Sequence, residues 1–566
     1  MDDPQKTAAG DLQDKLARLR REGEERAAEQ LAKKLGLPYA DLSKTPVSID
    51  ALRIIPEADA KGAKIAAIAL KARKVALAVS DPQLLAAQKA VKDLEAKKYE
   101  VKVFVASLSG LAQAWTLYKF IKPEAEEITG KVKIEESRLE ELSKRLTNFS
   151  AVQEEIKKVD FAKASPVTLM EIVLAGALSI RASDIHIEAG EKKAKIRLRV
   201  DGLLHDVFDD LPLPNHVSLV TRIKLLSGLK LNIRDIAQDG RFAINVGKKE
   251  VEIRVSLIPA EFGETIVMRI LDPEATSIGL VKLGLREDDL VIVHRQISRP
   301  NGLILNTGPT GSGKTTTLYA FLREVNDPEI KIITLEDPIE YRLEGVEQTQ
   351  VNKEAGYTFA NGLRAIVRQD PDIILVGEIR DLETADIALQ AALTGHLVLS
   401  TLHTNDAIGA VPRLINLGVR AVSIGPALSL VIAQRLVRRL CPDCKKQADT
   451  PPELRAKIKK FLDGLPQRVD KSKFANYKIY EAVGCAKCNN LGYKGRVGIY
   501  EFLEGGLDLE EIILKDASEL ALKALSEKRG MVTMQEDGVL KTLSGETTFK
   551  EVESATGEIE WLKGTS

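Results

Sequence analysis

The feature of this sequence that most constrains its fold is an apolar run that leads directly into a glycine-rich segment. The run is LILN, and the segment is GPTGSGKTTTLYA, residues 308–320, from which TTTLYAFLREV continues with helical spacing. A buried strand, a glycine-rich loop and a helix in this order form a phosphate-binding loop. The sequence therefore predicts an α/β domain that binds a nucleotide.

The loop fits the pattern G-x-x-x-x-G-K-[ST], and each residue type has a chemical reason. The glycines let successive N–H groups face the β-phosphate, and the helix that begins at Lys314 adds its positive dipole end. Lys314 supplies a charge to the β and γ oxygens, and the Thr315 hydroxyl is placed to bind Mg²⁺. We therefore expect ATP and Mg²⁺ at this loop. The expected nucleotide-binding residues are Gly308, Pro309, Thr310, Gly311, Ser312, Gly313, Lys314, Thr315 and Thr316.

Two acidic clusters follow apolar strands downstream of the loop. TLEDPIEYR follows the run KIIT, and DIILVGEIRD contains a buried strand followed by a turn at glycine. In the first cluster, Glu336, Asp337 and Glu340 are candidates to hold magnesium-bound water or to act as general base. In the second, Glu378 emerges where a metal-linked water would lie. Two carboxylate clusters at strand ends favour a hydrolytic site over a simple binding loop.

Two of the six histidines bracket another apolar strand, in TGHLVLSTLHTNDA. His396 precedes the run LVLST and His403 follows it, with Thr, Ser and Asn beside them. A single histidine is usually structural. Two of them at the ends of a strand near a phosphate site indicate sensors of the γ-phosphate.

Composition narrows the class of partner. The chain has 82 basic and 82 acidic residues and a formal net charge of zero, whereas a nucleic-acid binder usually carries a basic excess. The N-terminus shows no basic segment followed by an apolar stretch. AVSIGPALSLVIAQ, residues 421–434, has the length of a buried core helix rather than of a bilayer crossing. We therefore expect a cytoplasmic protein that does not bind nucleic acid.

The 566 residues are enough for three or four domains. Residues 1–120 begin with a solvated helix and continue with short apolar runs that alternate with amphipathic helices, which predicts a small α/β domain. The charged residues 121–160 predict a linker with an exposed helix. Residues 161–275 contain alternating segments such as KAKIRLRV and KEVEIRVSLIPA, typical of strands with one buried face, around a helical segment. Residues 276–566 hold the nucleotide-binding domain.

All four cysteines lie in two C-x₂-C pairs, CPDC and CAKC. Two such pairs can arrange four thiolates tetrahedrally around one Zn²⁺. The interval of 40 residues between the pairs is longer than the usual spacing. No cysteine is left over, and disulfides are disfavoured in a cytoplasmic chain. We predict structural zinc in a subdomain at about residues 436–500, with the ligands Cys441, Cys444, Cys485 and Cys488.

Together these motifs resemble those of the secretion ATPases that power type II secretion and type IV pilus assembly. GPTGSGKTTTLY resembles the Walker A motif of that family, TLEDPIE its Asp box, VGEIRD its atypical Walker B motif and TGHLVLSTLHTN its His box. The family also has a domain that precedes its nucleotide-binding motor domain. Four segments here resemble motifs of that preceding domain, namely SDIHIE, RVDG, QDGR and GETIVMR. The resemblance covers roughly residues 35–550. It implies a multidomain α/β protein with a RecA-like P-loop NTPase motor, a preceding PAS-like α+β domain, a small N-terminal α/β domain and a zinc-binding subdomain.

The resemblance also implies roles for the candidate site residues. Glu340 is implied as the catalytic base, Glu378 as the support of Mg²⁺ and water, and His396 and His403 as sensors of the γ-phosphate.

Four arginines are implied at the ATP site. Arg254 in EIRVS and Arg269 in IVMRI match middle-domain arginines that reach the nucleotide, and a guanidinium suits the charge of a phosphoryl-transfer transition state. Arg364 and Arg368 lie four residues apart, on one helical face, and match further nucleotide-side arginines.

By the same resemblance we expect a homohexameric ring at the inner face of the cytoplasmic membrane, held there by partners. Residues 1–120 would dock onto an inner-membrane platform protein through the cytoplasmic domain of a docking partner. The tetracysteine element favours filament assembly over pilus retraction. Some relatives bind cyclic di-GMP through an RLG-type motif, and LARLRREGEERAAEQL stands in that region here without a match.

Two other functions share parts of this pattern. A DNA-translocating or DNA-uptake motor of the same superfamily is the alternative, and the balanced charge argues against it. A nucleotide-binding regulator without hydrolysis is a third, and the intact Asp and His boxes argue against that. The sequence does not separate type II secretion from type IV pilus assembly, because both use this motor.

Overall fold

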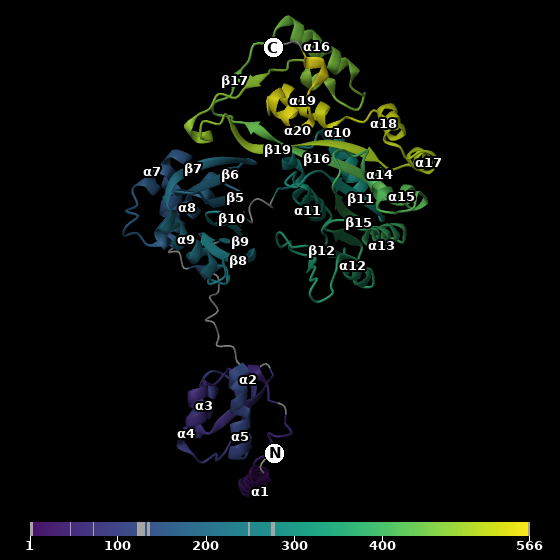
Figure 1. Cartoon of the computed structure of the whole chain (residues 1–566). Helices are drawn as coiled ribbons and strands as arrows, with labels where there is room; N and C mark the ends of the chain where they lie inside the picture. The colour runs from purple at the N-terminus through teal and green to yellow at the C-terminus, as the bar shows by residue number, and fades with distance from the viewer. Residues whose placement is uncertain are drawn as a thin grey trace. The chain divides into compact units, whose positions relative to one another are not determined.

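The fold is described from a computed structural model, shown in Figure 1. The described residues are 4–45, 47–71, 73–120, 131–132, 136–246, 249–272 and 278–563. The chain divides into two compact units, Met1–Ile128 and Thr129–Ser566, and each is described by itself.

The first unit is a small α/β domain, as the alternation of apolar runs predicts. Its sheet has the order β1-β2-β3, with β1 antiparallel to β2 and β2 parallel to β3. The strands are β1 (Ile65–Lys71), β2 (Lys74–Val79) and β3 (Glu100–Val105), and the helices are α1 (Pro4–Leu35), α2 (Ile49–Leu52), α3 (Glu57–Ala63), α4 (Leu85–Ala96) and α5 (Leu108–Trp115). Helix α4 connects the parallel pair β2 and β3, as parallel strands require.

The second unit begins with a seven-stranded sheet, here called the middle sheet, of order β4-β8-β9-β10-β5-β6-β7. Its strands are β4 (Lys131–Val132), β5 (Asp184–Ala189), β6 (Lys193–Val200), β7 (Leu203–Pro212), β8 (Gln238–Val246), β9 (Lys249–Ala260) and β10 (Gly263–Leu271), and its helices are α6 (Glu136–Arg145), α7 (Phe149–Lys157), α8 (Pro166–Ile180) and α9 (Leu213–Leu226). Strand β6 alternates between buried and more exposed residues, so one face of the sheet packs on a helical layer.

Part of the predicted linker is a folded part of this domain. Residues 121–130 and 133–135 lie outside the described residues. Within 136–157, helices α6 and α7 bury apolar side chains, including Leu139 and Ile156, in the core of the middle sheet. The expectation of an exposed helix here is therefore wrong, because a few well-spaced apolar residues are enough to dock a highly charged helix.

The phosphate loop belongs to a second seven-stranded sheet, here called the P-loop sheet, of order β13-β12-β14-β15-β11-β16-β19. Every neighbouring pair is parallel except β16 and β19. The strands are β11 (Gly302–Thr307), β12 (Ile332–Glu336), β13 (Glu347–Gln350), β14 (Ile373–Val376), β15 (Leu397–Leu402), β16 (Leu428–Leu440) and β19 (Tyr493–Glu504). Strands β11, β12, β14 and β15 are buried along their whole length, which explains their continuous apolar sequence.

Helices cover both faces of the P-loop sheet (Figure 1). Helices α10 and α11 pack on the strand side chains that point to one face of the sheet. Helices α12 to α15 pack on the alternate side chains, which point to the other face. These helices are α10 (Glu287–Ile297), α11 (Lys314–Val325), α12 (Phe359–Val367), α13 (Leu382–Leu393), α14 (Ala410–Asn416) and α15 (Ala421–Ala427). Because parallel strands share a direction, the ends of β11, β12, β14 and β15 that carry the predicted motifs meet at one edge.

The apolar segment 421–434 is only partly helical, which corrects the expectation of a buried core helix. Helix α15 ends at Ala427, and β16 begins at Leu428. A short apolar run does not distinguish a buried strand from a buried helix by its periodicity.

The C-terminal part extends from β16 and β19. The remaining elements are α16 (Pro452–Gly464), β17 (Lys446–Gln447), β18 (Tyr480–Glu481), α17 (Leu507–Lys515), α18 (Glu519–Lys528), α19 (Met534–Leu543) and α20 (Phe549–Thr556). Residues between the two cysteine pairs, such as Ile458 and Phe474, share a core with Val539 and Leu540 of α19. The segment between the cysteine pairs is therefore packed against the C-terminal helices.

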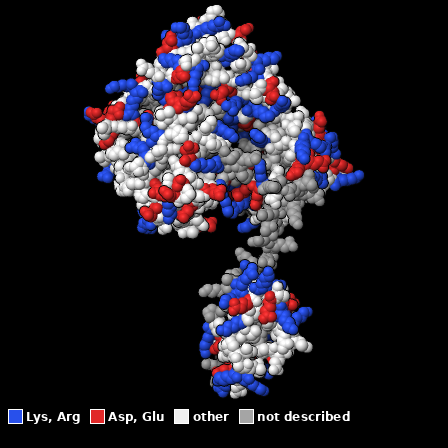
Figure 2. Space-filling model, turned by 180° about the vertical axis from the view of Figure 1, so that it is seen from behind, with Lys and Arg blue, Asp and Glu red and all other residues white. Residues whose placement is uncertain are grey.

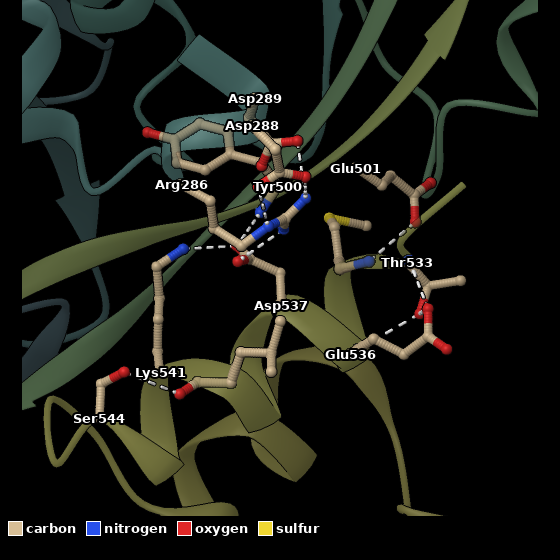
Figure 3. A network of polar contacts seen from close by, with 12 residues as sticks. Arg286, Asp288, Asp289, Tyr500, Glu501, Thr533, Glu536, Asp537, Lys541 and Ser544 are labelled. Carbon is tan, nitrogen blue, oxygen red and sulfur yellow. Dashed lines mark hydrogen bonds and ion pairs between the residues drawn. The ribbon is translucent and has the colours of Figure 1, made fainter. Parts of the chain in front are cut away.

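A buried ion cluster fastens α19 to the P-loop sheet (Figure 3). Asp537, which is fully buried, accepts hydrogen bonds from Nη1 of Arg286 at 2.8 Å, from Nζ of Lys541 at 2.5 Å and from the Tyr500 N–H at 2.9 Å. Burial would raise the pKa of Asp537, but Lys541 and Arg286 outweigh it and hold that pKa below its usual range. Asp537 is therefore ionised at neutral pH.

Candidate functional site

The phosphate loop has a buried base and an exposed tip. Gly308 and Ser312 are buried, whereas Pro309, Thr310 and Gly311 are exposed. Gly308 and Gly313 have φ values of +147° and +91°, which a residue with a side chain rarely adopts. Such a loop presents main-chain N–H groups rather than side chains to a ligand.

Lys314 lies over this loop at the start of α11. Its Nζ donates to the main-chain oxygens of Gly308 at 2.7 Å and Pro309 at 3.1 Å. Burial lowers the pKa of Lys314, and the carboxylate of Glu378 opposes that shift. The ammonium group therefore faces the space that the loop encloses, together with a carboxylate.

Glu378 follows β14 at the same edge of the sheet. Its Oε2 lies 2.6 Å from Nε of Arg380 and 3.5 Å from Nε2 of His403. Burial and the charge of Lys314 lower the pKa of His403, whereas Glu378 raises it. Lys314, Glu378 and His403, predicted from three separate motifs, are thus brought together, with Arg380 as a neighbour that the sequence did not single out.

The Asp box lies at the end of β12, and its carboxylates differ in surroundings. Glu336 is buried and accepts hydrogen bonds from the Tyr319 hydroxyl, from Oγ1 of Thr334 at 2.6 Å and from Nε2 of Gln348 at 3.2 Å. Both oxygens of Glu336 are occupied by protein donors. Asp337 is more exposed, and its Oδ2 lies 3.2 Å from Nζ of Lys353.

Glu340 is joined to the middle sheet. Its Oε2 lies 2.9 Å from Nη1 of Arg254, and Nη2 of the same arginine donates to the main-chain oxygen of Ile339 at 2.5 Å. The two side chains are 86 positions apart in the sequence. The carboxylate and the guanidinium predicted to act on the same phosphate are therefore in direct contact with each other.

Three arginines form a row across adjacent strands of the middle sheet. The register pairs Arg241 of β8 with Arg254 of β9, and Arg254 with Arg269 of β10. Arg269 Nε lies 2.9 Å from Oδ1 of Asp184, which is buried in β5. Neither Arg241 nor Asp184 was predicted as a site residue, although they lie in the motifs QDGR and SDIHIE.

Three other predicted residues have contacts or positions outside this group. His396 precedes β15, and its Nδ1 lies 3.0 Å from the main-chain oxygen of Ala391. Because β15 and β11 are parallel in register, His396 is at the opposite edge of the sheet from His403, about 20 Å away along a six-residue strand. Arg364 is paired with Glu383 of α13 at 2.5 Å. Helix α12 ends at Val367, so Arg368 is its C-cap residue rather than a neighbour on one helical face.

The four cysteines form one cluster, and their thiols fit a zinc ion. Their sulfur atoms all lie within 4.8 Å of one another, with separations of 4.0 Å for Cys441 and Cys485, 3.8 Å for Cys444 and Cys488 and 3.7 Å for Cys485 and Cys488. A tetrahedral Zn²⁺ with Zn–S bonds of about 2.3 Å needs sulfur atoms about 3.8 Å apart. The predicted ligand set is therefore brought together with spacing suitable for a metal.

On the face shown in Figure 2, basic and acidic side chains of the described residues are interspersed. None of the helices in the described ranges has the length and apolar character of a membrane span.

Two families of known proteins match the chain. Residues 160–554 match the family described as Type II/IV secretion system protein, and residues 35–119 match the MshEN domain. The first match covers the middle sheet except β4, and the whole P-loop sheet. The second covers the strands of the first unit.

Individual relatives agree with these matches. The chain is 38% identical to the type IV pilus assembly ATPase PilB of Myxococcus xanthus over 94% of this chain and 90% of that protein. It is 46% identical to the type II secretion system ATPase E of Vibrio cholerae over 69% of this chain and 75% of that protein. A solved structure, the ATPase DotB of Legionella pneumophila, is similar with a TM-score of 0.50 and 25% identity, over 69% of this chain and 95% of that one. These similarities confirm the predicted fold class, including the RecA-like core.

Proposed function

This chain belongs to the family of type II/IV secretion system proteins, and from that premise we propose that it is the cytoplasmic hexameric ATPase that powers assembly of a type IV pilus or a type II secretion pseudopilus. Membership in this family makes it an ATPase of secretion or pilus assembly. The hexamer, the location at the inner face of the cytoplasmic membrane and the docking partners are parts of the proposal.

The observation that carries the proposal is the gathering of hydrolytic groups at one edge of the P-loop sheet. Lys314, Glu378 and His403 come from three motifs after three parallel strands and lie close together. Glu340, after a fourth strand, is held by Arg254 of the preceding domain. A loop that only binds nucleotide does not need the carboxylates of Glu378 and Glu340. It also does not need an arginine from a separate sheet.

In the proposed reaction the protein positions ATP and stabilises developing charge. Lys314 would bind the β and γ oxygens of ATP. The Thr315 hydroxyl and Glu378 would hold Mg²⁺, which would neutralise phosphate charge when bound. His403, whose lowered pKa favours the neutral imidazole, can donate or accept a hydrogen bond at the γ-phosphate.

Glu340 is the proposed general base, and Arg254 controls its availability. In this arrangement Arg254 and Glu340 neutralise each other at 2.9 Å. Separation of the pair frees a carboxylate to accept a proton from water and a guanidinium to stabilise the phosphoryl charge. Arg269, beside Arg254 in register, is a second candidate for that charge. Because Arg254 lies on the middle sheet and Glu340 lies in the loop after β12 of the P-loop sheet, such a separation would couple hydrolysis to motion of the middle sheet.

Residues 1–120 are proposed to form the docking module. The MshEN match lies within them, and the first unit folds as a compact domain with its own core. We propose the platform protein, reached through the cytoplasmic domain of a docking partner, as its target. The predicted boundaries at 120, 160 and 275 stay predictions.

The proposed function is tested by phosphate release and native mass of the purified full-length chain. We expect Mg²⁺-dependent phosphate release that DNA does not stimulate. With a non-hydrolysable ATP analogue, we expect a particle of six times the 62.0 kDa chain mass. Strong stimulation by DNA would favour the DNA motor, and full activity of a monomeric particle would contradict the ring.

Zinc is the proposed occupant of the cysteine cluster, with a structural role. We expect the Cys441→Ser variant to lose a zinc content of about one ion per chain, measured by elemental analysis, and to become sensitive to proteolysis between residues 441 and 492. The matched control is Asp443→Ala, because Asp443 lies in the same knuckle but supplies no sulfur. Unchanged zinc content in Cys441→Ser would contradict the assignment.

A further inference from the structure

A buried glutamine beside the phosphate loop makes contacts that the proposed chemistry does not use. Gln434 lies in β16, parallel to β11, directly after Ala433, the register partner of Thr307. Only 1% of Gln434 is exposed. Gln434 is therefore located where β11 ends and the loop begins.

The side-chain amide of Gln434 is hydrogen-bonded at both of its ends. Its Oε1 accepts from Nδ2 of Asn306 at 3.0 Å and from Oγ1 of Thr317 at 2.8 Å. Its Nε2 donates to the Tyr500 hydroxyl at 3.4 Å, and that hydroxyl donates to the main-chain oxygen of Leu283 at 3.1 Å. Asn306 precedes the loop on β11 and Thr317 follows it on α11. One oxygen atom therefore joins the two elements that the loop connects.

Gln434 also limits the space at the two glycines that bound the loop. A Cβ atom at Gly308 would lie 2.4 Å from the main-chain oxygen of Gln434. A Cβ atom at Gly313 would lie 2.9 Å from Nε2 of the same residue. Both glycines are thus required for a second reason besides their positive φ, namely close approach to Gln434.

We propose that Gln434 is a positioning residue of the nucleotide site. It holds β11 and α11 at the separation that aims the N–H groups of the loop at the phosphates, without itself touching the nucleotide. Buried hydrogen bonds of this kind are costly to leave unmade, so their loss would let the loop adopt other conformations. This inference deepens the proposed function and rests on it only for the binding of nucleotide at the loop.

The test is Gln434→Met in the full-length chain. This change keeps the length and the burial of the side chain but removes the amide oxygen and the amide nitrogen. We expect the dissociation constant for a fluorescent ATP analogue with Mg²⁺ to rise about tenfold. In steady-state phosphate release, KM should rise by a similar factor and kcat should change less, because the loop binds phosphate in ground and transition states alike.

A second buried glutamine provides the matched control. Gln296 of α10 is 5% exposed, and its Nε2 donates to Oε2 of Glu504 at 2.9 Å. Gln296→Met should lower the melting temperature to an extent comparable with Gln434→Met but leave the dissociation constant unchanged. A dissociation constant of Gln434→Met close to that of the parent chain, or an equal rise in Gln296→Met, would overturn the proposal.

Thr317→Val keeps the proposal testable if Gln434→Met does not fold. This change removes one of the two donors to Oε1, and we expect nucleotide binding to weaken about threefold. Unchanged binding in this variant would count against a positioning role. Absence of phosphate release by the parent chain would contradict the proposed function alone, since the binding comparison would still decide the role of Gln434.

Discussion

Replacing Glu340 by glutamine is expected to abolish turnover while ATP still binds. The amide cannot take a proton from the attacking water, and loss of a general base typically lowers the rate by about 10²–10⁴-fold. The phosphate loop is unchanged, so the dissociation constant for ATP should remain within about twofold of the parent value. Phosphate release under saturating ATP and binding of a fluorescent ATP analogue measure the two quantities separately.

The control for this prediction is Glu344→Gln. Glu344 is an exposed carboxylate four residues further along the same segment, so its neutralisation removes the same charge without touching Arg254. Its phosphate release should match that of the parent chain. Normal turnover in Glu340→Gln would exclude Glu340 as the base and favour Glu378, whose charge raises the pKa of Lys314.

Replacing Asp537 by asparagine is expected to destabilise the domain that contains the P-loop sheet. The change keeps the shape of the side chain but removes the carboxylate charge that Lys541 and Arg286 share, so that Lys541 loses the acid it is paired with. Arg286 keeps Asp288 and Asp289 as partners. Removal of one partner from a buried ionic group typically costs about 3–5 kcal/mol, which lowers a melting temperature by on the order of 10 °C in a domain of this size. Thermal unfolding of the full chain, followed by calorimetry, provides the measurement.

A control variant at an exposed carboxylate on a neighbouring helix distinguishes this effect from the effect of losing one negative charge. Glu527 of α18 is exposed, and Glu527→Gln should shift the melting temperature by no more than about 1–2 °C. An Asp537→Asn variant as stable as the parent would mean that Asp288 and Asp289 suffice for Arg286, that Lys541 finds another partner or water, and that Asp537 contributes little to stability.

Local sequence pattern was enough to predict the phosphate loop and the carboxylates near it. Each motif follows a short apolar run that forms a strand. Because the strands are parallel, their carboxyl ends lie at one edge of the sheet. Lys314, Glu378 and His403 therefore meet as the motifs indicated. His396 does not, because the same rule places the residue before a strand at the opposite edge. The direction of β15 alone is therefore enough to predict that the two histidines lie at opposite edges of the sheet.

Contacts between distant segments could not be predicted in this way. The pair of Arg254 and Glu340 depends on how the middle sheet meets the P-loop sheet, which no local pattern encodes. Arg241 joins the row of arginines only through the order β8-β9-β10. Arg286 and Asp537 are 251 positions apart, and each alone reads as an ordinary surface charge.

The long interval between the phosphate loop and Asp537 has a consequence for how the protein is made. A ribosome completes β11 and the phosphate loop more than 200 residues before it adds Asp537, and it adds Gln434 and Tyr500 in the interval. Until the helix that bears Asp537 emerges, the Tyr500 N–H lacks its acceptor, and Arg286 is paired only with Asp288 and Asp289 among its partners in the cluster. A nascent or truncated chain thus carries a complete nucleotide motif in an incompletely supported sheet. The sheet that carries the nucleotide motif is in this sense completed late in translation.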